Sequence, residues 1–102
     1  MTLMRLTQLQ HNIIIQETQK LFGTSVTIRL FGSRINDKLK GGDIDLFLEF
    51  PNKNPDLWKK ILHLNTALQK RLGEQKIDII AHQLGEHLTD IHKEALKNGM
   101  IL

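Results

Sequence analysis

The stretch Phe31–Phe50 reads FGSRINDKLKGGDIDLFLEF and places two aspartates, Asp43 and Asp45, one residue apart in an otherwise apolar strand. Aspartate is depleted in strands, and a charged carboxylate is costly to bury. Residues i and i+2 of a strand project to the same side, about 6.6 Å apart. Ile44 and Leu46 then pack behind the pair. Two carboxylates on one face predict that a cation normally lies against them.

A third aspartate, Asp78, lies in an equally apolar segment between Ile77 and Ile79. Neighbouring strands lie about 4.8 Å apart, so adjacent strands would gather the three carboxylates into one patch. Such crowding raises carboxyl pKa values unless a cation offsets the repulsion. Oxygen-only ligands suit Mg²⁺ or Mn²⁺ rather than zinc. The alternative is that each aspartate caps a turn or points into solvent at the end of a strand.

The pair Gly32-Ser33 follows the first expected strand and predicts a second half of the same site. Glycine lets a ligand approach the backbone, and a helix that begins at Ser33 directs N–H groups and a hydroxyl at a phosphate. Serine is also a common helix N-cap, so a structural role is an alternative. Arg34, Lys38 and Lys40 follow in the loop, where each either contacts phosphate or lies in solvent.

Length and composition indicate one globular domain over residues 1–102, because 40% of the residues are hydrophobic and 25% are charged. The net charge of +3 is spread along the chain, and the sequence has only four Phe, one Trp and no Tyr. Nucleic acid is therefore the weaker partner, since single-strand binders stack bases on aromatic side chains. Without a signal-peptide pattern or a long apolar run, we expect a cytoplasmic protein without a membrane segment.

Hydrophobic periodicity and turn residues predict an alternation of helices and strands. The first helix is expected to have an inner face of Leu6, Leu9, Ile13, Ile14 and Leu21, and the helix over 55–72 a main stripe of Leu57, Ile61, Leu64, Leu68 and Leu72. The expected order is a helix over 6–22, a strand over 25–31, a short helical turn from 32–33, a strand over 43–50, a helix over 55–72, a strand over 75–82 and a helix over 88–98. This is an α/β (α+β) fold, α-β-α-β-α-β-α, with a small mixed three-stranded sheet. A short link predicts antiparallel first and second strands, and a long helix predicts parallel second and third strands.

Several local features carry narrower expectations. Asn54 is expected to cap the 55–72 helix, and Gly99 to end the last helix in the left-handed conformation. Trp58 and Leu62 form a second apolar row beside the main stripe of the 55–72 helix, which is either a broader core face or a partner patch. The closing residues 100–102, MIL, are either a terminal packing contact or a subunit interface.

The segments GSRINDKLKGGDIDLFLEF and KIDII together resemble the minimal nucleotidyltransferases of the DNA polymerase β superfamily. Their signature is Gly-Ser, a short loop, Asp-x-Asp, and a third Asp on the next strand. The resemblance implies that Gly32 and Ser33 hold the β- and γ-phosphates, with Arg34 beside them. It also implies that Asp43 and Asp45 bind two metal ions, and that Asp78 ligates the catalytic metal and helps to deprotonate the acceptor hydroxyl.

The same resemblance implies a function. The closing IHKEALKNGMIL is similar to the last helix of stand-alone members that are often encoded beside a HEPN-type helical protein. We therefore expect Mg²⁺-dependent transfer of AMP from ATP to a hydroxyl, here a tyrosine of a HEPN-type toxin, with this chain as the antitoxin. The loop from Ser33 to Asp43 contains nine intervening residues, one fewer than is usual, which bears on nucleotide binding. The alternative is a non-catalytic module that neutralises its partner by masking it.

Overall fold

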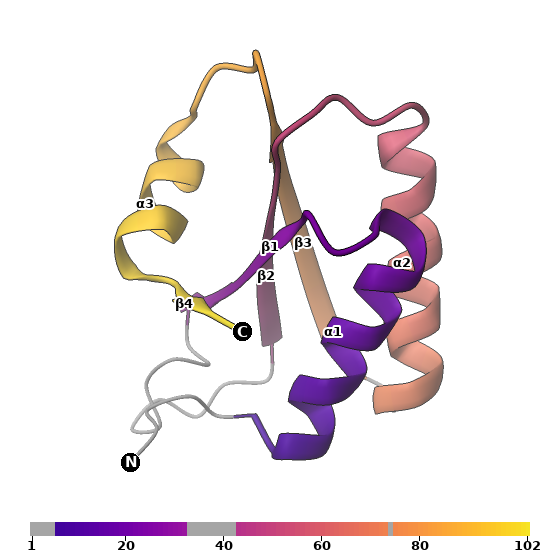
Figure 1. Ribbon diagram of the computed structural model, residues 1–102. Coiled ribbons are helices and arrows are strands. Elements are labelled where there is room, and N and C mark those ends of the chain that lie inside the picture. The colour runs from indigo at the N-terminus through magenta and orange to yellow at the C-terminus, as the bar shows by residue number, and fades with distance from the viewer. Residues whose placement is uncertain (1–5, 33–42, 74) are drawn as a thin grey trace.

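The computed structural model describes residues 6–32, 43–73 and 75–102, and Figure 1 shows their arrangement. The elements are α1 (Gln8–Phe22), β1 (Thr27–Phe31), β2 (Asp43–Phe50), α2 (Leu57–Leu72), β3 (Lys76–Gln83), α3 (Asp90–Asn98) and β4 (Met100–Ile101). The helical turn expected from Ser33 lies outside the described residues. Among the described helices, none is both long enough and apolar enough to cross a membrane.

The strands form one mixed sheet in the order β3-β2-β1-β4. As predicted, β1 runs antiparallel to β2, and β2 runs parallel to β3. The register places Phe31 opposite Asp45 and Asp45 opposite Asp78. This register matters for function, because it brings two of the predicted site residues onto neighbouring strands.

The fourth strand corrects the expectation of a three-stranded sheet. Met100 and Ile101 pair with β1, and the Leu102 N–H donates to the Ile28 carbonyl at 2.9 Å. The predicted left-handed conformation of Gly99 is also wrong, since its φ of −75° and ψ of 157° are extended. The physical reason is shared: the outer edge of β1 has backbone groups that need partners, and an extended Gly99 leads directly to them.

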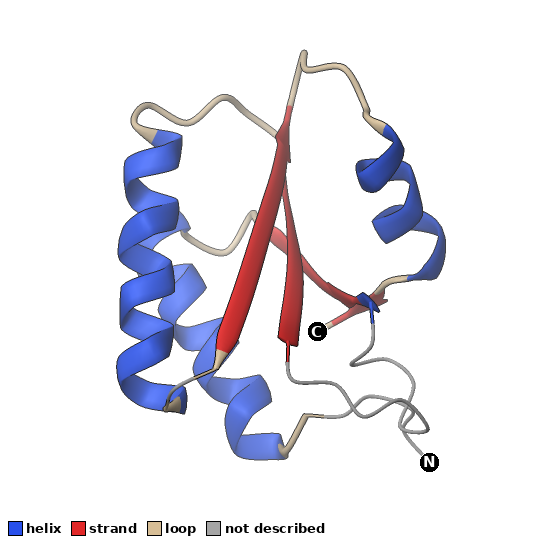
Figure 2. Cartoon of the chain, turned by 180° about the vertical axis from the view of Figure 1, so that it is seen from behind, coloured by secondary structure: helices blue, strands red, loops and turns tan. Residues whose placement is uncertain are grey.

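Helices cover the two faces of the sheet unequally, as Figures 1 and 2 show. α1 and α2 pack on one face over the main core, whereas α3 alone packs on the other. The smaller core under α3 consists of Phe31, Phe47 and Ala95. Because strand residues alternate between faces, Asp45 and Phe47 belong to the α3 face, and the α3 helix covers only part of it.

The stripe predicted for α2 is largely confirmed, because Leu57, Ile61, Leu64 and Leu68 are buried. The predicted start of α2 is wrong. The N-cap is Asp56, in a left-handed conformation with φ 55°, and the helix begins at Leu57. Asn54 instead serves the preceding loop, where its N–H donates to the Gln83 side chain at 2.8 Å and its side-chain amide donates to the Asn52 carbonyl.

An ion pair joins α1 to α2. The carboxylate of Glu17 accepts from Arg71 Nη1 at 2.7 Å and from Lys20 Nζ at 3.2 Å. The hydrogen bond from Arg71 is the main reason that the pKa of Glu17 lies below its ordinary value, and Lys20 adds to the effect against the opposing effect of burial. Glu17 therefore stabilises the fold at pH values above its unfolded pKa, and this contribution is lost as the pH falls through the lowered folded pKa.

Arg71→Met should therefore lower the free energy of unfolding most at neutral pH. The difference from wild type should shrink in acid, once Glu17 is protonated in both proteins. Urea unfolding at a series of pH values measures it. Lys70→Met is the matched control, because Lys70 is the exposed neighbour of Arg71 on the same helix. An Arg71→Met deficit that stays constant down to strongly acid pH would contradict the assignment to Glu17.

Candidate functional site

Two of the three predicted carboxylates lie side by side on the sheet. Asp45 in β2 and Asp78 in β3 are direct partners in the parallel register, so their Cα atoms lie about 4.8 Å apart. Asp45 is half-buried between β1 and β3, whereas Asp78 is exposed on the edge strand. The first carboxylate is thus held by its neighbours, and the second is accessible to a large reactant.

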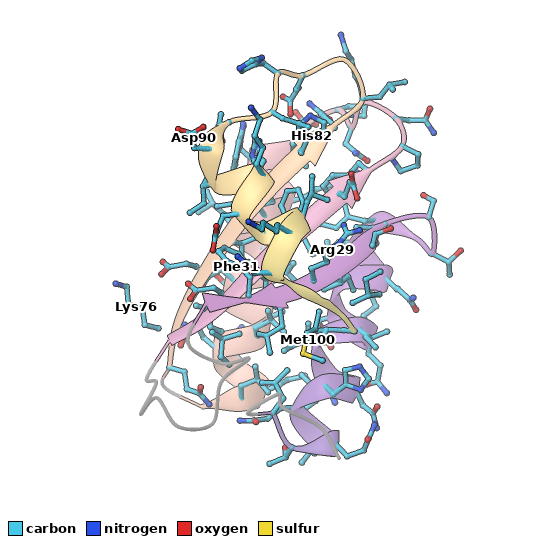
Figure 3. All side chains as sticks on the ribbon, turned by 90° about the vertical axis from the view of Figure 1, so that its left-hand side faces the viewer. Arg29, Phe31, Lys76, His82, Asp90 and Met100 are labelled. Carbon is cyan, nitrogen blue, oxygen red and sulfur yellow. The ribbon has the colours of Figure 1, made fainter. Side chains whose placement is uncertain are left out.

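Asp43 is placed by its backbone at the first position of β2, two residues before Asp45. Its partner in the register is Lys76 of β3, an exposed residue. Lys76 lies two residues before Asp78, and a strand's period of two assigns both to one face. No role for this lysine was predicted from the sequence. The signal that could have indicated it is the spacing of two between Lys76 and Asp78 in KIDII. Figure 3 shows the Lys76 side chain extending outward from the margin of the sheet, so this end of β3 carries a positive charge as well as Asp78.

Gly32 lies directly against the carboxylate of Asp45. It follows the last residue of β1 with a φ of +76°, and a Cβ at this position would overlap Asp45 Oδ2. A positive φ and a close approach to another group are the two conditions that favour glycine. The Gly-Ser half of the predicted site therefore begins beside the aspartate half. Ser33 and Arg34 lie outside the described residues, as do Lys38 and Lys40.

The donor set fits a hard divalent cation. In the described residues, no group of three or more His, Cys, Asp or Glu gathers as a metal site, and the Asp43 side chain is not among those described. Mg²⁺ in phosphoryl-transfer sites uses one or two carboxylates plus substrate phosphates and water. Asp45 and Asp78 meet that requirement as neighbouring oxygen donors, and Gly32 leaves space beside them.

Comparison with known families agrees with this geometry. The family model described as polymerase beta, nucleotidyltransferase matches residues 14–102. The chain belongs to the polymerase beta nucleotidyltransferase family. The match covers every strand, Gly32 and all three aspartates. A comparison with curated proteins found no match.

At the far end of the same face, the nucleotidyltransferase packs two histidines under α3. His92 lies 5.5 Å from the ring of Phe47 and 5.3 Å from the ring of His82, measured between centroids. His82 Nε2 donates to the Glu86 carbonyl at 2.8 Å, and His92 Nδ1 accepts from the Thr89 N–H at 3.2 Å. The ring contacts of His92 with Phe47 and His82 attach α3 to the sheet. Both histidines therefore have a structural role, and they follow Asp78 by four or more residues in the sequence.

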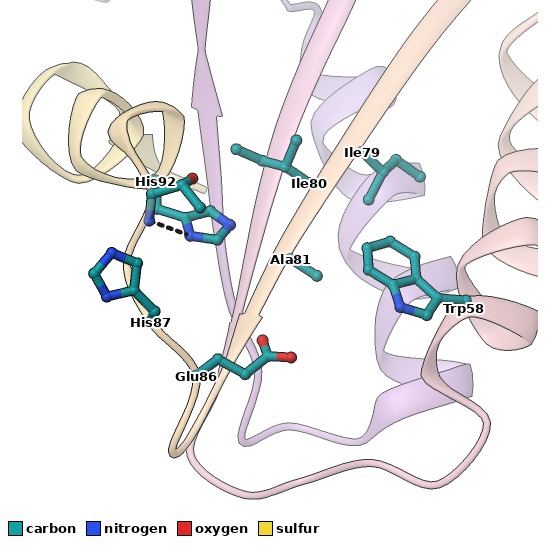
Figure 4. Close-up of a pocket in the computed structure, with 8 residues that line it drawn as sticks. Trp58, Ile79, Ile80, Ala81, Glu86, His87 and His92 are labelled. Atoms are coloured by element: carbon teal, nitrogen blue, oxygen red, sulfur yellow. Dashed lines mark hydrogen bonds between the residues drawn. The ribbon is translucent and has the colours of Figure 1, made fainter.

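A cavity of about 490 Å³ opens elsewhere, along β3 between α2 and α3 (Figure 4). The residues that line it are Trp58, Ile79, Ile80, Ala81, Glu86, His87, Thr89 and His92. Neither Asp45 nor Asp78 lines this cavity. The nucleotidyltransferase therefore has a concave region next to its acidic face, and its lining includes three consecutive residues of β3.

Proposed function

We propose that this nucleotidyltransferase transfers AMP from ATP to a hydroxyl group on another protein, with Mg²⁺ as the metal. The observation that carries the proposal is the register pairing of Asp45 with Asp78, with Gly32 in contact with Asp45. Family membership supports a nucleoside triphosphate and a divalent metal as the reactants. The choice of ATP and Mg²⁺ is our inference from the resemblance of the motif.

Each residue has a distinct role in this proposal. Asp43, Asp45 and Asp78 would hold the metal ions, which would supply positive charge to offset that of the triphosphate. Gly32 and Ser33 would bind the terminal phosphates through backbone N–H groups, and Arg34 would add a positive charge there.

The exposure of Asp78 suits a further task. A carboxylate on the edge strand can be reached by an acceptor hydroxyl. It can accept the hydroxyl proton as the oxygen bonds to the α-phosphorus of ATP and the bond to the departing pyrophosphate breaks. Asp45, enclosed by β1 and β3, is less accessible and acts through the metal alone. The acceptor is therefore proposed to approach over the face of the sheet that carries Asp45 and Asp78.

We infer that the acceptor is a tyrosine of a HEPN-type toxin, which the transfer would neutralise. The 102 residues contain no tyrosine, so a tyrosine acceptor lies outside these residues. Masking of the toxin without chemistry is the competing function, and the apolar side chains of Trp58 and Leu62, 62% and 69% exposed, favour some protein contact.

Transfer should therefore occur in trans. With α-labelled ATP and Mg²⁺, the HEPN-type partner should become labelled, and the isolated chain should not. Mass spectrometry of the partner should locate AMP on a tyrosine, and Tyr→Phe at that position should remove the label. A chelator provides the control for metal dependence. Equal labelling of the isolated chain and of the mixture would refute transfer in trans.

A further inference from the structure

The outer edge of β3 is closed at its N-terminal end by side chains of α2. Gln69 hydrogen-bonds both the N–H and the carbonyl of Gln75. Asn65 Nδ2 donates to the Ile77 carbonyl at 3.0 Å. Because β2 pairs with the other side of β3, these bonds identify the odd-numbered residues as those whose backbone groups point outward.

The middle of the same edge is open. At the C-terminal end, the Gln83 N–H donates to Glu86 Oε1 at 3.0 Å, which closes the edge there. Ile79 and Ala81 are odd-numbered, like the residues of β3 whose backbone groups are bonded on this edge. Their N–H and carbonyl groups therefore also point outward. Within the described part of the chain, no group outside the sheet bonds to them. The 490 Å³ cavity is lined by these same residues (Figure 4).

The side chains that α2 presents along this edge change from amides to apolar groups. Trp58, Leu62, Asn65 and Gln69 follow one another at spacings of four, three and four, which is one stripe of a helix. Asn65 and Gln69 are the amides that close the edge. Trp58 and Leu62 form none of the bonds that close the β3 edge, and their side chains are 62% and 69% exposed. The open segment from Ile79 to Ala81 carries no charged side chain. An open strand edge of this kind beside exposed apolar side chains is the arrangement to which another strand adds.

We propose that a second copy of this chain pairs here, β3 against β3, antiparallel about a two-fold axis at Ile80. In that register Ile79 faces Ala81 of the second copy, and Ala81 faces its Ile79. Facing residues of this kind exchange two hydrogen bonds, so the four open groups of each copy are all paired. A two-fold axis requires an edge that is complementary to itself. Ile79 and Ala81 lie at equal distances on either side of Ile80, so each meets the other in the second copy.

Charges also favour the second copy. The register places Asp78 opposite His82 of the second copy and Lys76 opposite its Leu84, so no two like charges face each other. The exposed side chains of Trp58 and Leu62 lie beside the seam, where both copies would bury them. The second copy would also bring His82 next to Asp78, at the edge of the acidic face.

The absence of cysteine allows a direct test by disulfide formation. In this register the two Ile80 Cα atoms lie about 4.5 Å apart, within the range that a disulfide spans. Under mild oxidation, Ile80→Cys should form a covalent dimer. Lys76→Cys is the control on the same strand. Its two copies lie about 27 Å apart, since the offset is eight residues, and it should stay monomeric when denatured.

Sedimentation equilibrium without nucleotide gives an independent measurement that does not depend on the transfer reaction. Wild type should reach twice the chain mass of 11.8 kDa. Leu62→Arg should weaken the dimer at least about tenfold, since it buries a charge in the seam. Leu9→Arg, on α1 at 67% exposure, should leave it unchanged. A monomer at all concentrations, a dimer insensitive to Leu62→Arg, or no Ile80→Cys disulfide would overturn the proposal.

Discussion

Asp78→Asn should reduce nucleotidyl transfer on the order of 10³-fold or more, because metal ligation and proton acceptance together supply several kcal/mol of transition-state stabilisation. The substitution keeps the shape of the side chain and removes its charge. Asp78 is exposed on the edge strand, so the fold does not depend on covering it. Single-turnover rates with saturating ATP, Mg²⁺ and partner measure the effect on chemistry separately from nucleotide binding.

The same variant predicts an opposite effect on the metal-free protein. Asp45 and Asp78 are register neighbours, and removing one of two adjacent negative charges should leave the melting temperature level or raise it. Mg²⁺ and ATP should then stabilise wild type much more than the variant, since a ligand at about 100 times its Kd adds about 2.7 kcal/mol. Thermal melts with and without Mg²⁺ and ATP give both quantities.

Asp56→Asn is the matched control for this pair of measurements. Asp56 is exposed and left-handed, and asparagine tolerates that conformation well. It should lose neither activity nor the stabilisation by nucleotide. If Asp78→Asn still neutralises a toxin fully in cells, masking rather than catalysis is the function. If Asp78→Asn unfolds the protein, the carboxylate is structural and the site is wrong.

The placement of Asp45 beside Asp78 was predictable because its signals are local. The strand Asp43–Phe50 has the bounds that the sequence predicts, since a Gly-Gly pair precedes this largely apolar segment and a proline follows it. The order of strands followed from the lengths of the links, which decide parallel or antiparallel pairing. Predicting that Asp45 lies beside Asp78 required the strand bounds and the strand order. It also required the apolar neighbours that identify the inner face of each strand.

Features that depend on long-range contact were not predictable. The β4 strand has two residues, too few for a periodic signal, and it forms because the β1 edge is available. Leu9 was expected on the inner face of α1 and is 67% exposed, because the buried face of the helix runs through Ile13, Ile14, Glu17 and Thr18. The contact of Gly32 with Asp45 joins the residue after β1 to a residue of β2, and the glycine alone indicates only a turn.

Gly32→Ala should disable the site through a single added methyl group. The new Cβ would overlap Asp45 Oδ2, so the carboxylate must rotate or β1 must shift. A misplacement of about 1 Å in a catalytic group costs on the order of 10²-fold in rate. The φ of +76° adds about 1–3 kcal/mol of backbone strain for any residue other than glycine. We therefore expect losses of both activity and stability.

Gly23→Ala separates these two losses. Gly23 has a similar φ of +80°, and an added Cβ would meet nothing within 4 Å. This control should lose about 1–3 kcal/mol of stability from strain alone and keep its activity. Equal losses of activity in both variants would show that general destabilisation, rather than the carboxylate contact, is responsible.

A double-variant cycle then isolates the contact itself. In an Asp45→Ala background the carboxylate is gone, so Gly32→Ala should cost only the backbone strain and lose the additional clash. The free energies of unfolding should show a coupling of about 0.5–3 kcal/mol between the two positions, as is usual for residues in contact. Chemical denaturation of the four proteins measures it. Strict additivity would mean that Asp45 moves aside freely, and that Gly32 does not hold the carboxylate in place for the metal.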